Sequence, residues 1–244
     1  MTPRRPSLRI SAGLRRVAMA LGLAAGLAGG PAAAEEPVVV ELFTSQGCSV
    51  CPPADALLGE LARRGDVLAL GLHVDYWDYI GWEDAFADPA YTRRQKSYAH
   101  AAGDRMIYTP QMIVDGTERL VGHDRHKISR AIDAELATPT AAVLAAIRDG
   151  SQVRVRAQAA DWPGGAADVV LVTYAPGRTV SILSGENAGH MLDYVNVVTG
   201  MVRIASWDGA APLDVTAELP GEGAVAVLLQ RPGPGEVLAA AKVD

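Results

Sequence analysis

Cysteine is scarce in this chain of 244 residues, which contains two, Cys48 and Cys51, three positions apart. A chain of this length can bury a sizeable core without disulfide staples, so the pair is not needed to hold a small framework together. The spacing alone leaves three explanations open: a structural disulfide, a metal clip and a redox couple.

The sequence also lacks several motifs that mark well-known activities. It has no glycine-rich phosphate loop, no G-x-S-x-G nucleophile motif and no helical zinc-protease motif. After residue 34, no apolar run reaches the roughly 20 residues that a membrane-spanning helix needs. We therefore do not predict chemistry that depends on any of these motifs.

The first 34 residues predict a secretory signal peptide. Five arginines and no acidic residue precede an apolar segment at 17–27, and Ala32-Ala33-Ala34 fits a small-residue cleavage site. A membrane anchor is the alternative, but the apolar segment is short for one. The signal predicts a periplasmic or secreted location.

Charge narrows the range of partners. Removal of residues 1–34 lowers Lys plus Arg from 22 to 17 and leaves Asp plus Glu at 28, which gives a net charge of −11. Nucleic acids and anionic membranes are bound by positively charged surfaces. Neither is therefore a predicted partner of the mature chain.

Hydrophobic patterning predicts a strand–helix–strand unit at the start of the mature chain. Residues 38–43 (VVVELF) and 67–74 (VLALGLHV) are typical of buried strands. Between them, apolar residues recur at helical spacing over 54–61, and Arg63-Arg64-Gly65 is typical of a helix end. This order predicts a parallel pair with a right-handed crossover.

The remaining patterns predict an α/β domain followed by a smaller β domain. An aromatic loop is expected at 75–82, helices at 88–102 and 124–136, and strands at 111–114 and 118–121 around an Asp115-Gly116 turn. After a change of composition at 138–140, short β patterns occur at 153–156, 169–172, 195–198 and 224–229. We predict a βαβ-containing α/β domain with a helical insertion at 35–138 and a mostly antiparallel β domain at 139–244.

The cysteine pair lies between the first predicted strand and helix. There the unsatisfied N–H groups and positive end of the helix favour the Cys48 thiolate and make it the nucleophile. Cys51, one turn further on, can attack a mixed disulfide at Cys48 and resolve it. Pro52 is tolerated in the first helical turn. A C-x-x-C motif beside a βαβ pattern therefore indicates a redox site.

A second indication is Thr109-Pro110, at the mouth of the strand at 111–114. Proline allows the cis peptide bond that other residues almost exclude. A cis bond here would expose the Thr109 backbone to pair with an extended substrate next to the sulfurs. An ordinary loop proline is the alternative, and the combination with C-x-x-C and the Asp115-Gly116 turn favours the cis form.

These motifs and the predicted element order resemble thioredoxin over residues 37–137. The stretches ELFTSQGCSVCPPAD, HVDYWDYIGW, YTPQ and GENAGH also resemble a family of predicted secreted bacterial proteins. That family is classed as a domain of unknown function with a thioredoxin-like fold, and the resemblance covers most of the mature chain. It implies the fold but little mechanism, because the family's activity is not established.

The resemblance to thioredoxin implies roles for single residues. Cys48 matches the nucleophile, Cys51 the resolving cysteine and Pro110 the cis-proline. Glu41 lies on the strand where thioredoxins keep a buried acid, which could exchange protons with Cys51; an exposed glutamate is the alternative. Ser49-Val50 replaces the Gly-Pro of thioredoxin, so redox potential and substrate choice stay open.

Several neighbouring residues have two interpretations. The aromatic residues of the loop form either a substrate platform or a cap on the core; they are Tyr76, Trp77, Tyr79 and Trp82. His73 either completes a copper or zinc site with Cys48 and Cys51 or is a hydrogen-bonded structural residue. Residues 184–190 either fold back toward the site or form a simple turn.

We therefore predict an exported thiol–disulfide oxidoreductase that acts on a protein or small thiol substrate and is recycled by a second redox partner. No cofactor is expected. The predicted site residues are Cys48, Cys51, Pro110, Thr109 and Glu41. The alternatives are a copper-delivery protein that uses both thiolates with His73, and a thioredoxin-fold scaffold with an inert disulfide.

Overall fold

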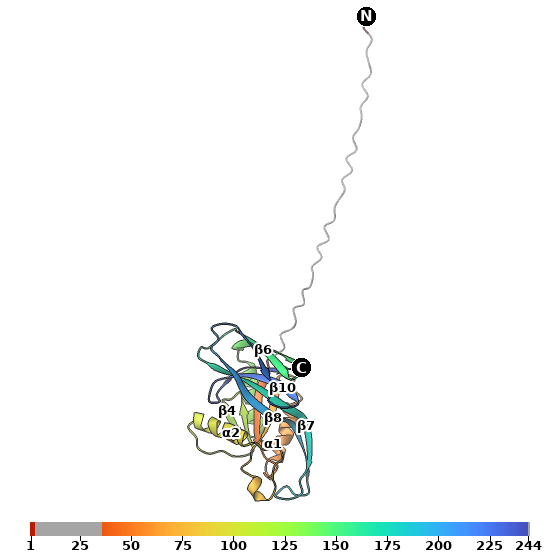
Figure 1. Ribbon diagram of the computed structural model, residues 1–244, viewed down its shortest axis with the longest axis vertical. Helices are drawn as coiled ribbons and strands as arrows, with labels where there is room; N and C mark the ends of the chain where they lie inside the picture. Colours follow the sequence, from red (N-terminus) through yellow and green to blue (C-terminus); the bar gives the residue numbers. More distant parts are fainter. Residues whose placement is uncertain (3–35, 244) are drawn as a thin grey trace. The chain divides into compact units, whose positions relative to one another are not determined.

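The apolar run after residue 37 forms a strand that is buried from end to end. The computed structural model describes residues 1–2 and 36–243, and residues 35–244 form one compact unit (Figure 1). β1 (Val38–Thr44) pairs in parallel with β2 (Val67–His73), and α1 (Pro52–Leu61) connects them. Both strands are buried throughout, as expected for parallel strands with two covered faces. The predicted strand–helix–strand unit is confirmed.

Helices cover both faces of this part of the sheet. α1 and α3 (Arg125–Leu136) share a core with Val38, Val40 and Leu42 of β1. α2 (Pro89–Ala101), preceded by the 3-10 turn η1 (Asp78–Ile80), shares a core on the other side with Val39 and Phe43. Because side chains of a strand alternate between its faces, even-numbered residues of β1 point to α1 and odd-numbered ones to α2.

Most of the strands after β2 belong to the same sheet as β1 and β2. They are β3 (Gln111–Val114), β4 (Glu118–Val121), β5 (Ala142–Asp149), β6 (Gln152–Ala159), β7 (Ala167–Ser181), β8 (Met191–Trp207), β9 (Leu213–Glu218), β10 (Ala224–Gln230) and β11 (Val237–Val243). Eight strands lie in the order β11-β10-β7-β8-β2-β1-β3-β4. β8 meets β2 in parallel, with Val197 opposite Gly71. Next to this contact, the Asn196 side chain donates a hydrogen bond to the Ala69 carbonyl at 2.8 Å.

The other three strands form a second layer, in the order β5-β6-β9. Its inner face, with Val153 and Val155, packs on residues of β7 and β10 such as Leu171 and Val227. β7 and β8 are 15 and 17 residues long. Their hairpin therefore continues past this layer to the end of the molecule where α1 begins (Figure 1).

The fold is a mixed α/β fold, as predicted. The predicted division into two domains at residue 138 stays a prediction. The eight-stranded sheet contains strands from both sides of this residue. The predicted signal peptide, residues 1–34, falls outside the described residues apart from its first two. Among the residues that the structure describes, no helix is both long and apolar enough to cross a membrane.

Candidate functional site

Cys48 and Cys51 form a disulfide in the loop between β1 and α1. Their Cα atoms are 5.4 Å apart. The Cys51 N–H donates to the Cys48 carbonyl oxygen at 3.1 Å, and Cys51 is the N-cap residue of α1, ahead of Pro52. Because the helix begins at this turn, its positive end lies beside the cysteines and favours a thiolate over a thiol.

Thr109 and Pro110 lie at the same end of the sheet. The peptide bond between them is cis, as predicted. Pro110 approaches the first turn of α1: a Cβ added at Gly122 would be 2.9 Å from the Pro110 Cβ and 3.2 Å from the Ala54 Cβ. The Thr109 hydroxyl accepts a hydrogen bond from Trp77 Nε1 at 2.7 Å. The structure thus places both residues near the helix end that carries the cysteines.

Glu41 is a buried acid, as the resemblance implied, but its carboxylate is paired with Arg94. It is buried, but it lies on the face of β1 that meets α2, whereas α1 covers the other face. Arg94 donates to its two carboxylate oxygens at 2.6 and 3.0 Å, and the Tyr98 hydroxyl also donates to it. Glu41 is therefore the buried ion-pair partner of Arg94. This corrects the expectation that Glu41 exchanges protons with Cys51.

Asp55 has its carboxyl group on the same side of the sheet as the cysteines. It follows Cys51 by one helical turn, and its N–H donates to the Cys51 carbonyl oxygen at 3.1 Å. The Thr44 hydroxyl donates to Asp55 Oδ1 at 2.8 Å. Burial raises the pKa of Asp55 to about 7, although His73 and the Thr44 hydrogen bond act in the opposite direction. Sequence reasoning missed Asp55 because an acid in a first helical turn is common.

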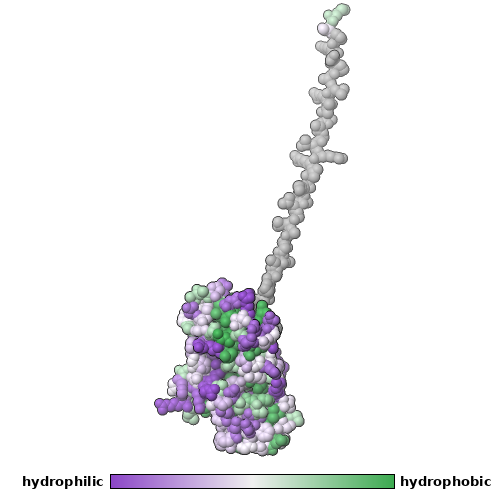
Figure 2. Space-filling model, viewed as in Figure 1, coloured by the Kyte–Doolittle hydropathy of each residue, from purple (hydrophilic) through white to green (hydrophobic). Residues whose placement is uncertain are grey.

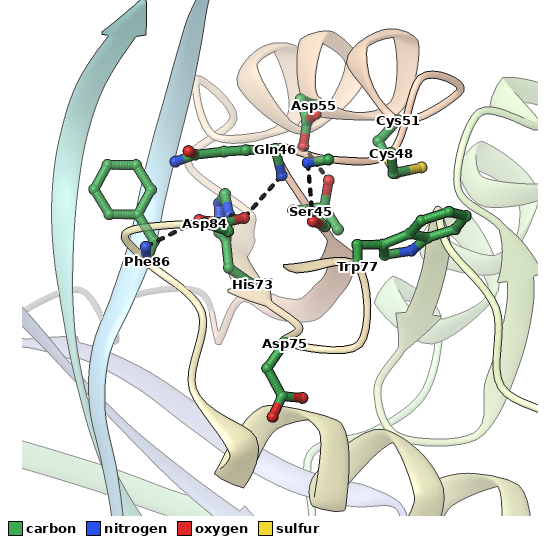
Figure 3. Close-up of polar contacts among 12 residues, drawn as sticks. Ser45, Gln46, Cys48, Cys51, Asp55, His73, Asp75, Trp77, Asp84 and Phe86 are labelled. Carbon is green, nitrogen blue, oxygen red and sulfur yellow. Dashed lines mark hydrogen bonds and ion pairs between the residues drawn. A yellow bond between two sulfur atoms is a disulfide. The ribbon is translucent and has the colours of Figure 1, made fainter. Parts of the chain in front are cut away.

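His73 pairs with Asp84 below the cysteine loop (Figure 3). Asp84 Oδ2 lies 2.7 Å from His73 Nδ1 and accepts the N–H of Gln46 at 2.8 Å. The His73 ring packs edge-on against Phe86 and Tyr194. Within residues 36–243, no group of three or more His, Cys, Asp or Glu side chains is placed to hold a metal ion. The alternative metal site of His73 with both cysteines is therefore not assembled.

The hairpin between β7 and β8 contacts the cysteine loop. At its tip, the buried side-chain amide of Asn187 donates to the carbonyl oxygens of Gln46 at 2.8 Å and Cys48 at 3.1 Å. The Ser184 hydroxyl donates to the Gly81 carbonyl oxygen at 2.6 Å. Of the two interpretations of residues 184–190, folding back toward the site is the correct one. The glycine-punctuated pattern of residues 184–190 pointed to the segment that contains Asn187 but not to this side chain, and no sequence pattern singled out Asp84; the two act over separations of 139 and 38 residues.

The aromatic residues of the loop at 75–82 mostly cap other residues. Tyr76 and Trp77 pack against the core on the α2 side of the sheet. Trp82 Nε1 donates to Gln46 Oε1 at 2.8 Å. Tyr79 is 82% exposed. Three of the four side chains therefore cover the core or the cysteine loop, and one faces solvent.

A cavity of about 630 Å³ lies elsewhere in the molecule. It is lined by Val38 at the start of β1 and by acidic residues that include Asp66, Asp115 and Glu236. The cysteine loop follows Thr44, at the opposite end of β1. This cavity is therefore not part of the cysteine site.

The fold and the site define a mixed α/β protein with a C-x-x-C disulfide at the start of a helix. The chain belongs to the family of proteins of unknown function DUF1223, whose model matches residues 39–230. This confirms the expected class of domain. No curated protein matches the chain.

Two solved structures are similar to this chain. One is the crystal structure of protein AGR_C_4864 from Agrobacterium tumefaciens, with 34% sequence identity and a TM-score of 0.73 over 84% of this chain and 92% of that one. The other is HBP35 of Porphyromonas gingivalis, with 14% identity and a TM-score of 0.60 over 85% of this chain and 74% of that one. The second likeness concerns the fold alone.

Proposed function

We propose that the protein is a thiol–disulfide oxidoreductase. The observation that carries this proposal is the Cys48–Cys51 disulfide at the start of α1. A helix N-terminus lowers the pKa of a nearby thiol, which makes its sulfur reactive. The position of Thr109 near the same helix end supports the proposal, since an extended substrate that pairs with its backbone would lie beside the cysteines.

The proposed reaction proceeds through a mixed disulfide. In the oxidising direction, a substrate thiolate attacks the Cys48 sulfur, the Cys48–Cys51 bond breaks, and Cys51 leaves as a thiolate that takes up a proton. A second substrate thiolate then attacks the mixed disulfide and releases Cys48. The protein gains two electrons, and the substrate leaves with a disulfide. The reducing direction is the reverse of these steps.

We assign to Asp55 the role of exchanging a proton with the Cys51 sulfur. A carboxyl group whose pKa is about 7 can hold or release a proton at neutral pH, which an ordinary aspartate cannot. Asp55 lies one turn from Cys51 on the same helix, whereas Arg94 holds Glu41 on the other face of the sheet. Protonated Asp55 supplies the proton to the leaving thiolate, and its carboxylate takes the proton back in the reverse step.

We further propose that the protein works outside the cytoplasm, on a thiol or disulfide substrate, with a second protein that recycles the cysteines. The signal-peptide pattern of residues 1–34 supports export, and disulfides persist in exported compartments. The net charge of the mature chain, −11, supports a partner other than nucleic acid or an anionic membrane surface.

Trapping of the mixed disulfide tests the proposed function. In reduced Cys51→Ser, the Cys48 thiolate attacks oxidised glutathione, forms a Cys48–glutathione disulfide and releases one glutathione thiolate. This adduct persists because the resolving sulfur is absent. We expect intact-mass measurements to show the adduct forming faster in Cys51→Ser than in Cys48→Ser, since only Cys48 is the assigned nucleophile.

The burial of both cysteines favours a second candidate function, a scaffold with a structural disulfide. Neither residue has measurable exposure, and buried structural cysteines are inert. In a scaffold, both serine variants would react equally slowly with oxidised glutathione while they stay folded. That result would replace the oxidoreductase with the scaffold.

A further inference from the structure

Both cysteines are closed off from solvent although their loop lies at the surface. Cys48 and Cys51 are 0% exposed, whereas Val50 between them is 58% exposed. At this end of the molecule, where η1 and the β7–β8 hairpin lie, Figure 2 shows some hydrophobic residues among polar ones. Another segment of the chain must therefore cover the two sulfurs.

The loop at 75–82 supplies part of this cover. A Cβ added at Gly47 would lie 3.3 Å from the Trp77 Cβ and 3.3 Å from the Ile80 Cδ1, so the loop packs directly on the residue before Cys48. Figure 3 shows the Trp77 indole next to the Cys48 sulfur. Together with the packing on Gly47, this position makes the indole the candidate cover of the Cys48 sulfur.

One hydrogen bond holds the indole across the site. Trp77 Nε1 donates to Thr109 Oγ1 at 2.7 Å, and Thr109 precedes the proline that approaches α1. This bond joins the loop on one side of the cysteines to the segment on the other side. It uses the side-chain hydroxyl of the residue whose backbone the proposed function assigns to the substrate.

The two ends of the loop are fixed independently of this bond. At one end, Asp75 Oδ1 accepts a hydrogen bond from the Thr92 hydroxyl at 2.5 Å. At the other end, the Gly81 carbonyl oxygen accepts one from Ser184, and Gly81 has a φ of 97°, which glycine adopts without strain. Loss of the Trp77–Thr109 bond therefore removes one restraint on the indole while both anchors of the loop stay in place.

We propose that Trp77 is a gate that determines which thiols reach the Cys48–Cys51 disulfide. In the closed position, its indole shields the sulfur and bonds to Thr109. When the indole moves away, the sulfur and Thr109 become accessible together. A small thiol has to wait for spontaneous opening, whereas a partner that binds Thr109 and offers the loop apolar contacts stabilises the open position. The claim that the gate selects partners rests on the proposed function. The claim that the indole limits access to the disulfide does not depend on it.

The rate of reduction by dithiothreitol tests the gate. One thiolate of dithiothreitol attacks a sulfur of the disulfide, and the other then closes the reagent into a ring, so two electrons pass to the protein and the two cysteine thiolates take up protons. If opening precedes attack and reclosing is fast, the rate follows the population of the open form. One hydrogen bond of ordinary strength corresponds to about a 2- to 12-fold change in that population.

Two variants remove the same bond from opposite sides. Trp77→Phe keeps an aromatic ring but loses the N–H donor, and Thr109→Val keeps the side-chain shape but loses the acceptor, together with the hydrogen bond between Thr109 and the Tyr76 side chain. We expect each to be reduced about 2- to 12-fold faster than the parent protein, and the double variant no faster than the faster single variant. Tyr79→Ala, in the same loop but exposed, is the matched control and should react at the parental rate.

Two results would overturn the gate. Reduction of Trp77→Phe and Thr109→Val at the parental rate would show that the indole does not limit access. Reduction rates that instead follow the free energies of unfolding of all five proteins would show that access requires global unfolding. Neither result bears on whether Cys48 forms a mixed disulfide in Cys51→Ser, so failure of the gate and failure of the proposed function are distinguishable.

Discussion

Replacement of Asp55 by asparagine should change the way in which the free energy of unfolding depends on pH. In the folded protein, burial raises the pKa of Asp55 from 3.8 to about 7. In the unfolded chain, the carboxyl group regains its ordinary pKa. Between these two pKa values, the unfolded chain has released the proton and the folded protein still holds it. The stability of the parent protein therefore falls as pH rises through this window.

The size of the effect follows from the difference between the two pKa values. Each unit is worth about 1.4 kcal/mol, so the contribution of Asp55 falls by about 4 kcal/mol from below pH 3.8 to above pH 7. Asp55→Asn removes this titration and keeps an oxygen that can accept the Thr44 hydroxyl hydrogen bond. Relative to the parent, the variant should gain stability as pH rises from 4 to 8.

Urea denaturation at several pH values between 4 and 8 measures this difference. Asp115 and Glu36 also have pKa values raised by burial to about 7, so the parent curve alone does not isolate Asp55. Subtraction of the variant curve from the parent curve cancels both of these groups. A difference that stays constant from pH 4 to 8 would refute the raised pKa of Asp55 and with it the proton-transfer role.

Two further substitutions test the surroundings of the site. Arg94→Met leaves the buried Glu41 carboxylate without its partner, so we expect a loss of about 3–5 kcal/mol of unfolding free energy in urea. Addition of Glu41→Gln should restore most of it, and a double variant as unstable as Arg94→Met would contradict the ion-pair role. Asn187→Ala removes the side-chain donor to the carbonyl oxygens of Gln46 and Cys48, of which Cys48 keeps the Cys51 N–H, and should cost about 1–3 kcal/mol in the same assay. Glu186→Ala, at an exposed neighbour, should change stability by less than about 0.5 kcal/mol, and equal effects of the two alanine variants would count against Asn187 as an anchor of that loop.

Local patterns in the sequence were sufficient for the framework around the cysteines. The continuous apolar runs that become β1 and β2, the helical spacing after Pro52 and the Asp115-Gly116 turn each specify their element through neighbouring residues. The cis bond at Thr109-Pro110 was predicted from the combination of this pair with the C-x-x-C motif and the Asp115-Gly116 turn, since the pair alone also fits an ordinary loop proline.

The face of β1 on which each side chain lies could not be predicted in the same way. β1 is buried on both sides, so its residues show no alternation of polar and apolar types. Resemblance placed Glu41 near Cys51, but its partner Arg94 comes from α2, 53 residues away and on the other face. Asp55, which shares the cysteine face, looked like an ordinary acid near a helix N-terminus.

Contacts between distant segments were also beyond local patterns. Asp84 and Asn187 hold the cysteine loop from segments that fold back onto it. The sequence suggested this return for residues 184–190 but indicated neither the role of Asn187 nor that of Asp84. The predicted β patterns at 169–172 and 195–198 are short parts of β7 and β8, because only the packing of the sheet extends these strands to 15 and 17 residues. Tertiary packing therefore decides how the second half of the chain meets the site.

The redox equilibrium of the Cys48–Cys51 pair tests the central claim most directly. The mature protein would be equilibrated in graded buffers of reduced and oxidised glutathione, and the reduced fraction would be measured by thiol labelling and intact mass. We expect a reversible two-electron transition between about −120 and −270 mV, the range of thiol–disulfide catalysts. A disulfide that stays oxidised below about −300 mV would contradict exchange chemistry and identify the pair as a structural disulfide.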